Sequence, residues 1–187
     1  MTVPTQLDER FRAQAASEGL LDVAYDVATD TPIGSLLLAA TERGVCRISF
    51  DSDPEDHLEE LARKYGARVL RSPRPLDTLR RELDDYFEGR RHDFDLPLDL
   101  EAVPAFHRAV LEELVRVPYG RTATYGGLAA RIGRPRAARA VGGACNRNPI
   151  PIVVPCHRVV GSTGNLVGYA GGLERKAALL RLEGASF

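Results

Sequence analysis

The sequence predicts an α+β protein, with a small sheet-containing N-terminal half followed by a mostly helical C-terminal half. Between residues 20 and 50, apolar residues alternate with polar or small ones, which is the pattern of half-buried strands. Over 54–87 and again beyond 106, apolar residues recur at three- and four-residue spacing, as on the buried face of a helix. We therefore divide the chain into a scaffold domain, residues 1–98, and a helix-turn-helix domain, residues 99–187.

The N-terminal half is expected to contain an antiparallel meander and two helices. Asp30-Thr31-Pro32 and Glu42-Arg43-Gly44 have turn chemistry and separate three strands. Asp53, in the N-cap position before Pro54, predicts where the first helix begins. The polar, Ala-rich residues 1–19 are interpreted as a loose leader or a short helix. The expected strands are 21–27, 34–41, 46–50 and 67–70, and the expected helices are 54–65 and 76–87.

The C-terminal half is expected to form a helix, a helix-turn-helix, an extended segment and a closing helix. Thr124 is the expected N-cap of the first helix of the pair, and Gly133-Arg134-Pro135 turns the chain into a second helix over 136–146. Three prolines exclude a helix over 148–155 and are expected to hold this segment extended. Apolar stripes predict the two outer helices, 106–115 and 173–182.

Charge is divided unevenly between the two halves. Residues 1–98 carry 13 basic and 20 acidic side chains, a net −7, whereas residues 99–187 carry 12 and 6, a net +6. No Asp or Glu occurs from Leu114 through Leu173, and the eight basic residues of that stretch are all arginines. Scattered solvated charge explains such a gap poorly, so we expect this half to meet a polyanion.

The three cysteines and four histidines lack the spacing of a metal site or a disulfide framework. Cys46, Cys145 and Cys156 form an odd set without close pairing, and no C-x-x-C or H-x-x-x-H motif occurs. We therefore expect no metal and no cofactor. The sequence begins without an apolar leader, and no stretch approaches membrane-spanning length, so the expected location is the cytoplasm.

Pro155-Cys156-His157-Arg158-Val159 is the most informative stretch, because it places a thiol beside an imidazole in the acid-free, arginine-rich region. A nearby positive field favours thiolate over thiol, so Cys156 is expected to ionise more easily than a free cysteine. A neutral His157 would take the thiol proton directly or through a water, since neighbours in an extended chain point to opposite faces. The carboxylate that orients His157 is either Glu174 or Glu183, and composition does not choose between them.

Each of these features also has a purely structural interpretation. A lone cysteine is most often a buried, inert thiol, and Cys46 is interpreted that way. The small residues around Arg139 allow close approach to a groove or tight helix packing, although Gly142-Gly143 costs helix stability, about 1 kcal/mol for each glycine. The glycine-rich loop 162–172 is interpreted as a mobile lid or a phosphate cradle, but it lacks the Lys-Ser/Thr ending of a nucleotide-binding P-loop.

From about Phe106 to Gly184, the sequence resembles the O6-alkylguanine-DNA alkyltransferases, the methylated-DNA–protein-cysteine methyltransferases. The block Pro-Ile-Val-Val-Pro-Cys-His-Arg-Val is highly specific. The resemblance implies a ribonuclease-H-like α/β N-terminal domain, by its pattern of elements alone, and a winged-helix-like C-terminal domain that carries the helix-turn-helix. The matching segments are Tyr119-Gly120, Thr124-Tyr125-Gly126, Ala137 to Ala144, Asn148-Pro149 to Val159 and Tyr169-Ala170-Gly171-Gly172-Leu173.

The resemblance also implies roles for individual residues. Cys156 would accept the alkyl group, His157 would draw its proton through a water, and Glu183 would orient His157. Asn148 would brace the helix-turn-helix against the Cys156 segment, and Tyr125 would push the target phosphate and assist protonation of the departing guanine. The other expected DNA contacts are Arg139, which would fill the gap left by the flipped base, and Ala137, Ala138, Gly142 and Arg147. The expected pocket residues are Pro151, Val154, Gly168, Tyr169 and Lys176.

The implied function is DNA repair by irreversible transfer of the alkyl group from O6-alkylguanine, flipped out of duplex DNA, to Cys156, once per molecule. Double-stranded DNA is the expected partner of a monomer. Alkyl-size preference, O4-methylthymine as a second substrate and cooperative binding along DNA stay open. Two other functions fit parts of the sequence: a non-catalytic lesion-binding or transcription-regulating helix-turn-helix protein, and a Cys-His-Glu hydrolase. Cys145 departs from the family pattern without explanation, and the metal-binding cysteines of some relatives are absent, which argues against an adaptive-response regulator.

Overall fold

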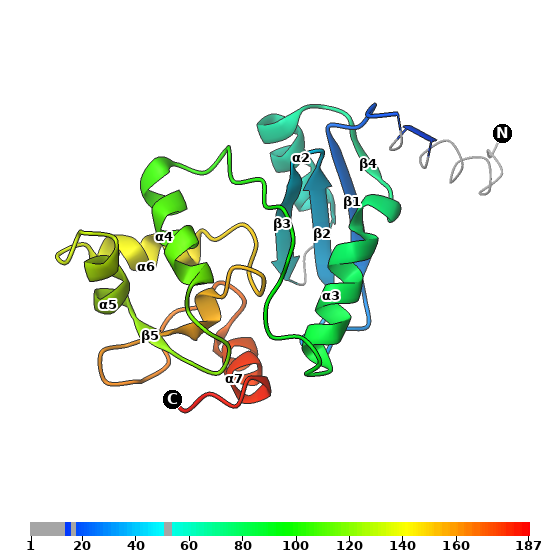
Figure 1. Cartoon of the computed structure of the whole chain (residues 1–187). Helices are drawn as coiled ribbons and strands as arrows, with labels where there is room; N and C mark the ends of the chain where they lie inside the picture. The colour runs from blue at the N-terminus through cyan, green and yellow to red at the C-terminus, as the bar shows by residue number, and fades with distance from the viewer. Residues whose placement is uncertain (1–13, 16–17, 51–53) are drawn as a thin grey trace. The chain divides into compact units, whose positions relative to one another are not determined.

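The structure is a computed structural model that describes residues 14–15, 18–50 and 54–187 of the chain (Figure 1). It forms two compact units: unit 1 contains the described residues up to Asp85 together with Asp95–Ala102, and unit 2 contains Tyr86–Phe94 and Val103–Phe187. Tyr86–Phe94, from the first half of the sequence, thus belongs to the helical unit. Most of the expected leader over 1–19 and the expected Asp53 cap lie outside the described residues.

Unit 1 is a four-stranded sheet with a helix on each face (Figure 1). The predicted antiparallel meander is confirmed, and a fourth strand pairs in parallel with the first, giving the order β3-β2-β1-β4. One face packs Leu61 of the first helix against Val23, and on the other face Arg80 of the second helix reaches the buried Asp26. The elements are β1 (Val23–Ala28), β2 (Leu36–Thr41), β3 (Gly44–Phe50), α2 (Pro54–Tyr65), β4 (Val69–Arg71), the 3-10 helix η1 (Arg74–Leu76) and α3 (Asp77–Phe87).

Unit 2 is built around a helix-turn-helix formed by α5 (Tyr125–Arg131) and α6 (Ala138–Asn146). The predicted cap at Thr124 is confirmed, because its Oγ1 accepts a hydrogen bond from the backbone N–H of Gly127 at 3.0 Å. Helix α6 begins two residues later than expected, since Arg134–Ala137 form a turn closed by a backbone bond of 2.8 Å. The other elements are α4 (Ala105–Val115), β5 (Ala123–Thr124), the 3-10 helix η2 (Cys156–Arg158), β6 (Val159–Val160) and α7 (Leu173–Leu182).

The segment 148–155 is a tight turn, so the expected extended conformation was wrong. Its backbone closes between Val154 N–H and Ile150 O at 2.9 Å, and Ile152 has a φ of 75°, which is strained for a β-branched residue. Pro155, with φ −81° and ψ 62°, forms an inverse γ-turn that delivers Cys156 to the start of η2. Proline restricts φ and removes a donor but leaves ψ free to turn, so three prolines exclude a helix without enforcing extension.

A two-stranded parallel pairing connects the helix-turn-helix to the Cys156 segment. Ala123 lies opposite Val159 and Thr124 opposite Val160. Because α5 begins directly after β5 and η2 ends directly before β6, this pairing places Tyr125 near Cys156. Within the described residues, no helix is both long and apolar enough to cross a membrane.

Candidate functional site

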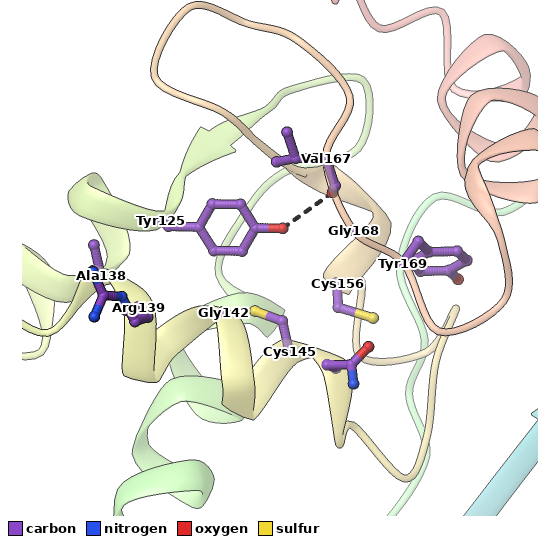
Figure 2. A pocket seen from close by; sticks show the side chains of 10 residues that line it. Tyr125, Ala138, Arg139, Gly142, Cys145, Cys156, Val167, Gly168 and Tyr169 are labelled. Atoms are coloured by element: carbon purple, nitrogen blue, oxygen red, sulfur yellow. Dashed lines mark hydrogen bonds between the residues drawn. The ribbon is translucent and has the colours of Figure 1, made fainter.

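A pocket of about 490 Å³ lies in unit 2, a size typical of small-molecule sites. Figure 2 shows α6 along one side and the segment from Val167 to Tyr169 along the other, with Tyr125 and Cys156 between them. The lining residues are Tyr125, Ala138, Arg139, Gly142, Cys145, Asn146, Cys156, Val167, Gly168 and Tyr169.

Asn148, which does not line the pocket, donates a hydrogen bond to the thiol of Cys156. Its Nδ2 donates to Cys156 Sγ at 3.1 Å and to the carbonyl of Val154 at 2.7 Å. Its Oδ1 accepts from the backbone N–H of Ile150 at 3.0 Å. Both ends of the amide are therefore fixed by the 148–155 turn, so the strained turn orients a hydrogen-bond donor at the sulfur.

The thiol of Cys156 is not acidic in the protein alone. Burial raises its pKa to about 11, and the Asn148 hydrogen bond and the positive charge of Lys176 only partly oppose this rise. The expectation that the arginine field would ease ionisation was therefore wrong for the unbound protein. Arg158, the nearest arginine in sequence, is paired with Glu183, and Arg139 is exposed to solvent, where its charge is screened.

His157, which follows Cys156 in the sequence, forms a buried pair with Glu183. His157 Nε2 lies 2.8 Å from Glu183 Oε1, whereas Glu174 is exposed in the first turn of α7, so the structure pairs His157 with Glu183. Burial lowers the pKa of His157, which is neutral. Burial alone would raise the pKa of Glu183, but hydrogen bonds from His157 and Arg158 lower it to about 2.

The charge on Glu183 determines which nitrogen of His157 carries the proton. An ionised carboxylate only accepts hydrogen bonds, so Nε2 of the neutral imidazole must be the donor. Nδ1 is then the basic nitrogen. It is buried and has no hydrogen-bond partner among the described residues. His157 is thus arranged as an acceptor for a proton.

Two residues that the sequence did not assign to the site also bind Glu183. Arg158 Nε and Nη2 each donate to its carboxylate at 2.9 Å, and its Nη1 donates to the carbonyl of Val117. The Tyr86 hydroxyl donates to Glu183 Oε1 at 2.7 Å. The sequence could have indicated Arg158 as a site residue, since it follows His157 in the specific motif. It gave no indication for Tyr86, because Tyr86 lies on an apolar helix stripe that is typical of a buried core.

Tyr125 and Lys176 hold the glycine-rich loop that follows β6. The hydroxyl of Tyr125 donates to the carbonyl of Val167 at 3.2 Å (Figure 2). Lys176 Nζ donates to the same carbonyl at 2.8 Å and to that of Gly168 at 3.4 Å. Burial raises the pKa of Tyr125 to about 12, so its hydroxyl is protonated at neutral pH. These bonds fix one side of the pocket to α5 and α7.

The other residues expected at the site lie around the pocket. Pro151 and Val154 are buried in the turn, and Lys176 donates to the loop carbonyls; none of these three lines the pocket. Ala137 and Arg147 flank the two ends of α6, and Arg147 Nη2 lies 3.2 Å from His107 Nε2.

Two lining residues were not expected, Cys145 and Asn146, whereas Val167 is the neighbour of the expected Gly168. Cys145 faces the pocket from α6, and burial raises the pKa of its thiol to about 12. Throughout the described part of the chain, no group of three or more His, Cys, Asp or Glu residues is placed to hold a metal ion.

The two halves of the chain match two family descriptions. Residues 24–100 match "6-O-methylguanine DNA methyltransferase, ribonuclease-like domain", and residues 105–185 match "6-O-methylguanine DNA methyltransferase, DNA binding domain". The methylated-DNA–protein-cysteine methyltransferase of Methanosarcina barkeri is 42% identical over 165 residues, which cover 85% of this chain and 96% of the relative. The constitutive enzyme of Bacillus subtilis is 38% identical over 164 residues, covering 87% and 97%.

Solved structures that resemble this chain belong to proteins of the same kind. Mycobacterium tuberculosis OGT in complex with DNA has a TM-score of 0.75 at 38% identity and covers 86% of this chain and 92% of its own. The O6-methylguanine-DNA methyltransferase of Pyrococcus kodakaraensis has a TM-score of 0.60 at 30% identity, covering 87% and 99%. The predicted fold class, a sheet-containing N-terminal part before a mostly helical C-terminal part, is confirmed. The chain belongs to the 6-O-methylguanine DNA methyltransferase family.

Proposed function

We propose that Cys156 is the alkyl acceptor of this DNA repair methyltransferase and that O6-alkylguanine in double-stranded DNA is the donor. The observation that carries the proposal is the arrangement around the thiol. Cys156 lines a pocket and accepts a hydrogen bond from Asn148, and the next residue, His157, is neutral with its Nδ1 unpartnered among the described residues. Alkyl transfer requires a nucleophile that faces the substrate pocket and a neutral base that can take its proton.

Unit 2 supplies the surface for DNA. Extruding the target nucleotide costs a few kcal/mol, and an inserted side chain is one way to offset that cost. Arg139 is exposed near the start of α6 and lines the pocket, which suits it to fill the gap. Ala137, Ala138 and Gly142 allow α6 to approach the groove closely, and Arg147 would contact a phosphate. We continue to predict that the protein is a monomer located in the cytoplasm.

The chemistry follows from the protonation states. The resting thiol is neutral, so its proton must leave when the substrate occupies the pocket, through a water to His157 Nδ1. The sulfur then bonds to the alkyl carbon as the carbon–O6 bond breaks and its electron pair moves to guanine. The Tyr125 hydroxyl, which would also push the target phosphate, stays protonated and lines the pocket, so it can assist protonation of the leaving base by donating a hydrogen bond to it. The proton taken from the thiol by His157 then returns to the guanine through water. The thioether has no good leaving group, so each molecule reacts once.

Intact-mass measurement after incubation with a duplex containing O6-methylguanine tests the proposal. Wild type should gain one methyl group, mapped to Cys156 by peptide mass, and stop at one. Cys156→Ala should gain none while still binding DNA, and Cys145→Ala, which removes the other pocket thiol, should react like wild type. A methyl group on the Cys156→Ala variant would contradict the proposal. A non-catalytic binder would gain no mass, and a hydrolase would turn over repeatedly.

A further inference from the structure

We propose that Tyr86 is a positioning residue of the alkyl-transfer site, which fixes the carboxylate oxygen of Glu183 that receives the hydrogen bond from His157. The inference rests on the proposed function and adds to it a residue encoded at the end of α3. Tyr86 belongs to unit 2 together with the rest of the site.

Glu183 accepts more hydrogen bonds than one orienting contact to His157 requires. Its Oε1 accepts from His157 Nε2 at 2.8 Å, from the Tyr86 hydroxyl at 2.7 Å and from Arg158 Nη2 at 2.9 Å. Its Oε2 accepts from Arg158 Nε at 2.9 Å and from the backbone N–H of Gly120 at 3.3 Å. Tyr86 and His157 therefore share one oxygen, while the backbone contact holds the other.

Sharing Oε1 gives the Tyr86 hydroxyl a specific effect on His157. Its hydrogen bond draws negative charge on Oε1 away from the imidazole and helps to hold that oxygen in place beside His157 Nε2. Without it, the charge would stabilise a protonated His157 more strongly, and the Nε2–H bond would have more freedom. Either change reduces the fraction of molecules in which Nδ1 is a free base.

The ring of Tyr86 is held by an aromatic cluster. Its centroid lies 5.4 Å from that of Phe94 and 6.1 Å from that of Tyr119, the latter edge to face. Tyr86 is fully buried, so solvent does not compete for its hydroxyl. Tyr119 belongs to the same cluster and lies under the Arg158 guanidinium, but its own hydroxyl donates to the carbonyl of Leu182 at 3.0 Å. Tyr119→Phe is thus a matched control, because it removes a neighbouring hydroxyl that does not touch Glu183.

The test compares full-length wild type, Tyr86→Phe and Tyr119→Phe in single-turnover transfer from O6-methylguanine duplex across pH. Tyr86→Phe should transfer about tenfold more slowly near neutrality, and the acid limb of its rate profile should move to higher pH. Its affinity for the duplex should stay unchanged. In spectra of ¹⁵N-histidine-labelled protein, the Nε2–H signal of His157 should shift. Tyr119→Phe should leave the rate profile and this signal as in wild type.

Two outcomes would overturn the inference while leaving the proposed function intact. One is a wild-type rate profile and His157 signal in Tyr86→Phe. The other is an equal, pH-independent loss of rate in both variants together with a lower Tm, which would indicate packing alone. Methyl uptake by Cys156→Ala in the same assay would instead contradict the proposed function, so the two failures are distinguishable.

Discussion

Cys46 in unit 1 and Cys156 in unit 2 are both buried free thiols, and their surroundings differ. Cys46 packs in the sheet core with Val23, Ala39 and Leu61. Cys156 lines the pocket and accepts a hydrogen bond from a side chain. Burial raises the pKa of Cys46 to about 12 and that of Cys156 to about 11, so neither thiol is ionised at neutral pH in the resting protein.

A low resting pKa does not distinguish Cys156, the proposed alkyl acceptor, from the core thiol of Cys46. The two thiols differ by only about one pKa unit, while access, a hydrogen-bond donor at the sulfur and a neutral base next in sequence are particular to Cys156. Keeping the thiol protonated until a substrate enters also protects it from oxidation, because reactivity follows the thiolate. We therefore expect the surroundings of the sulfur, rather than its resting charge, to set the reactivity of Cys156.

The largest effect should come from removing the charge that orients His157. Glu183→Gln should slow alkyl transfer by at least about 100-fold, because His157 loses its tautomer control and Arg158 loses its partner. Single-turnover kinetics measures this rate, on a variant that circular dichroism shows to be folded. The control is Asp26→Asn in unit 1, which also removes a buried carboxylate bonded to two arginines, Arg71 and Arg80. It should lower stability without changing the rate, and a wild-type rate in Glu183→Gln would contradict the role given to this residue.

A smaller effect should follow from removing the donor at the sulfur. Asn148→Ala should raise the pKa of Cys156 further and slow transfer by about tenfold, and Asn148→Asp should slow it more, because a carboxylate repels the thiolate. The pH dependence of iodoacetamide labelling, followed cysteine by cysteine by mass spectrometry, reports the thiol. Cys46 in the same molecule is the internal control and should label as in wild type. Unchanged labelling of Cys156 in both variants would show that Asn148 does not act on the sulfur.

Acid should remove part of the stability of the protein through Glu183. The pKa of this carboxyl is about 2 in the folded protein against an ordinary value of 4.5. Its lowered pKa contributes stability above pH 4.5, and this contribution is lost as the pH falls from there through about 2. Urea unfolding between pH 6 and 3 should therefore show the gap between wild type and Glu183→Gln narrowing toward low pH. A constant gap would rule out this linkage.

The smallest effect on chemistry should come from the thiol of unit 1. Cys46→Ala should transfer methyl at the wild-type rate and lower the free energy of unfolding by about 1 kcal/mol, because it removes one buried atom from a packed core. Transfer kinetics and urea unfolding of the same preparation measure both quantities. A loss of transfer in this variant would contradict the separation between the two thiols.

Local signals in the sequence predicted a large part of the fold. Alternation over 20–50 predicted the antiparallel meander, and Thr124 predicted the start of α5 because its side chain caps the helix it precedes. The adjacency of Cys156 and His157 in the sequence predicted the nucleophile and the base that we propose. Each of these signals acts within a few residues, where propensity, capping and turn chemistry are decisive.

Other parts of the site could not be read from local patterns. Prolines over 148–155 excluded a helix, but the positive φ of Ile152 arises from closing the turn and from Asn148 bridging its ends. Tyr86 reads as a core aromatic because its spacing is that of a helix stripe. We infer its second use only from the hydrogen bond between its hydroxyl and Glu183, which lies far along the chain.

The amino-acid sequence alone determined the order of the strands and α-helices of the N-terminal half, the helix-turn-helix, and the adjacency of a thiol and an imidazole in an acid-free, arginine-rich region. The tertiary structure alone decided how that thiol titrates, which carboxylate and hydroxyl support the imidazole, and which residues line the pocket. The physical reason is that burial and hydrogen bonding depend on atoms brought together from distant positions. A pKa or a cavity is therefore a property of the packed chain and not of a motif.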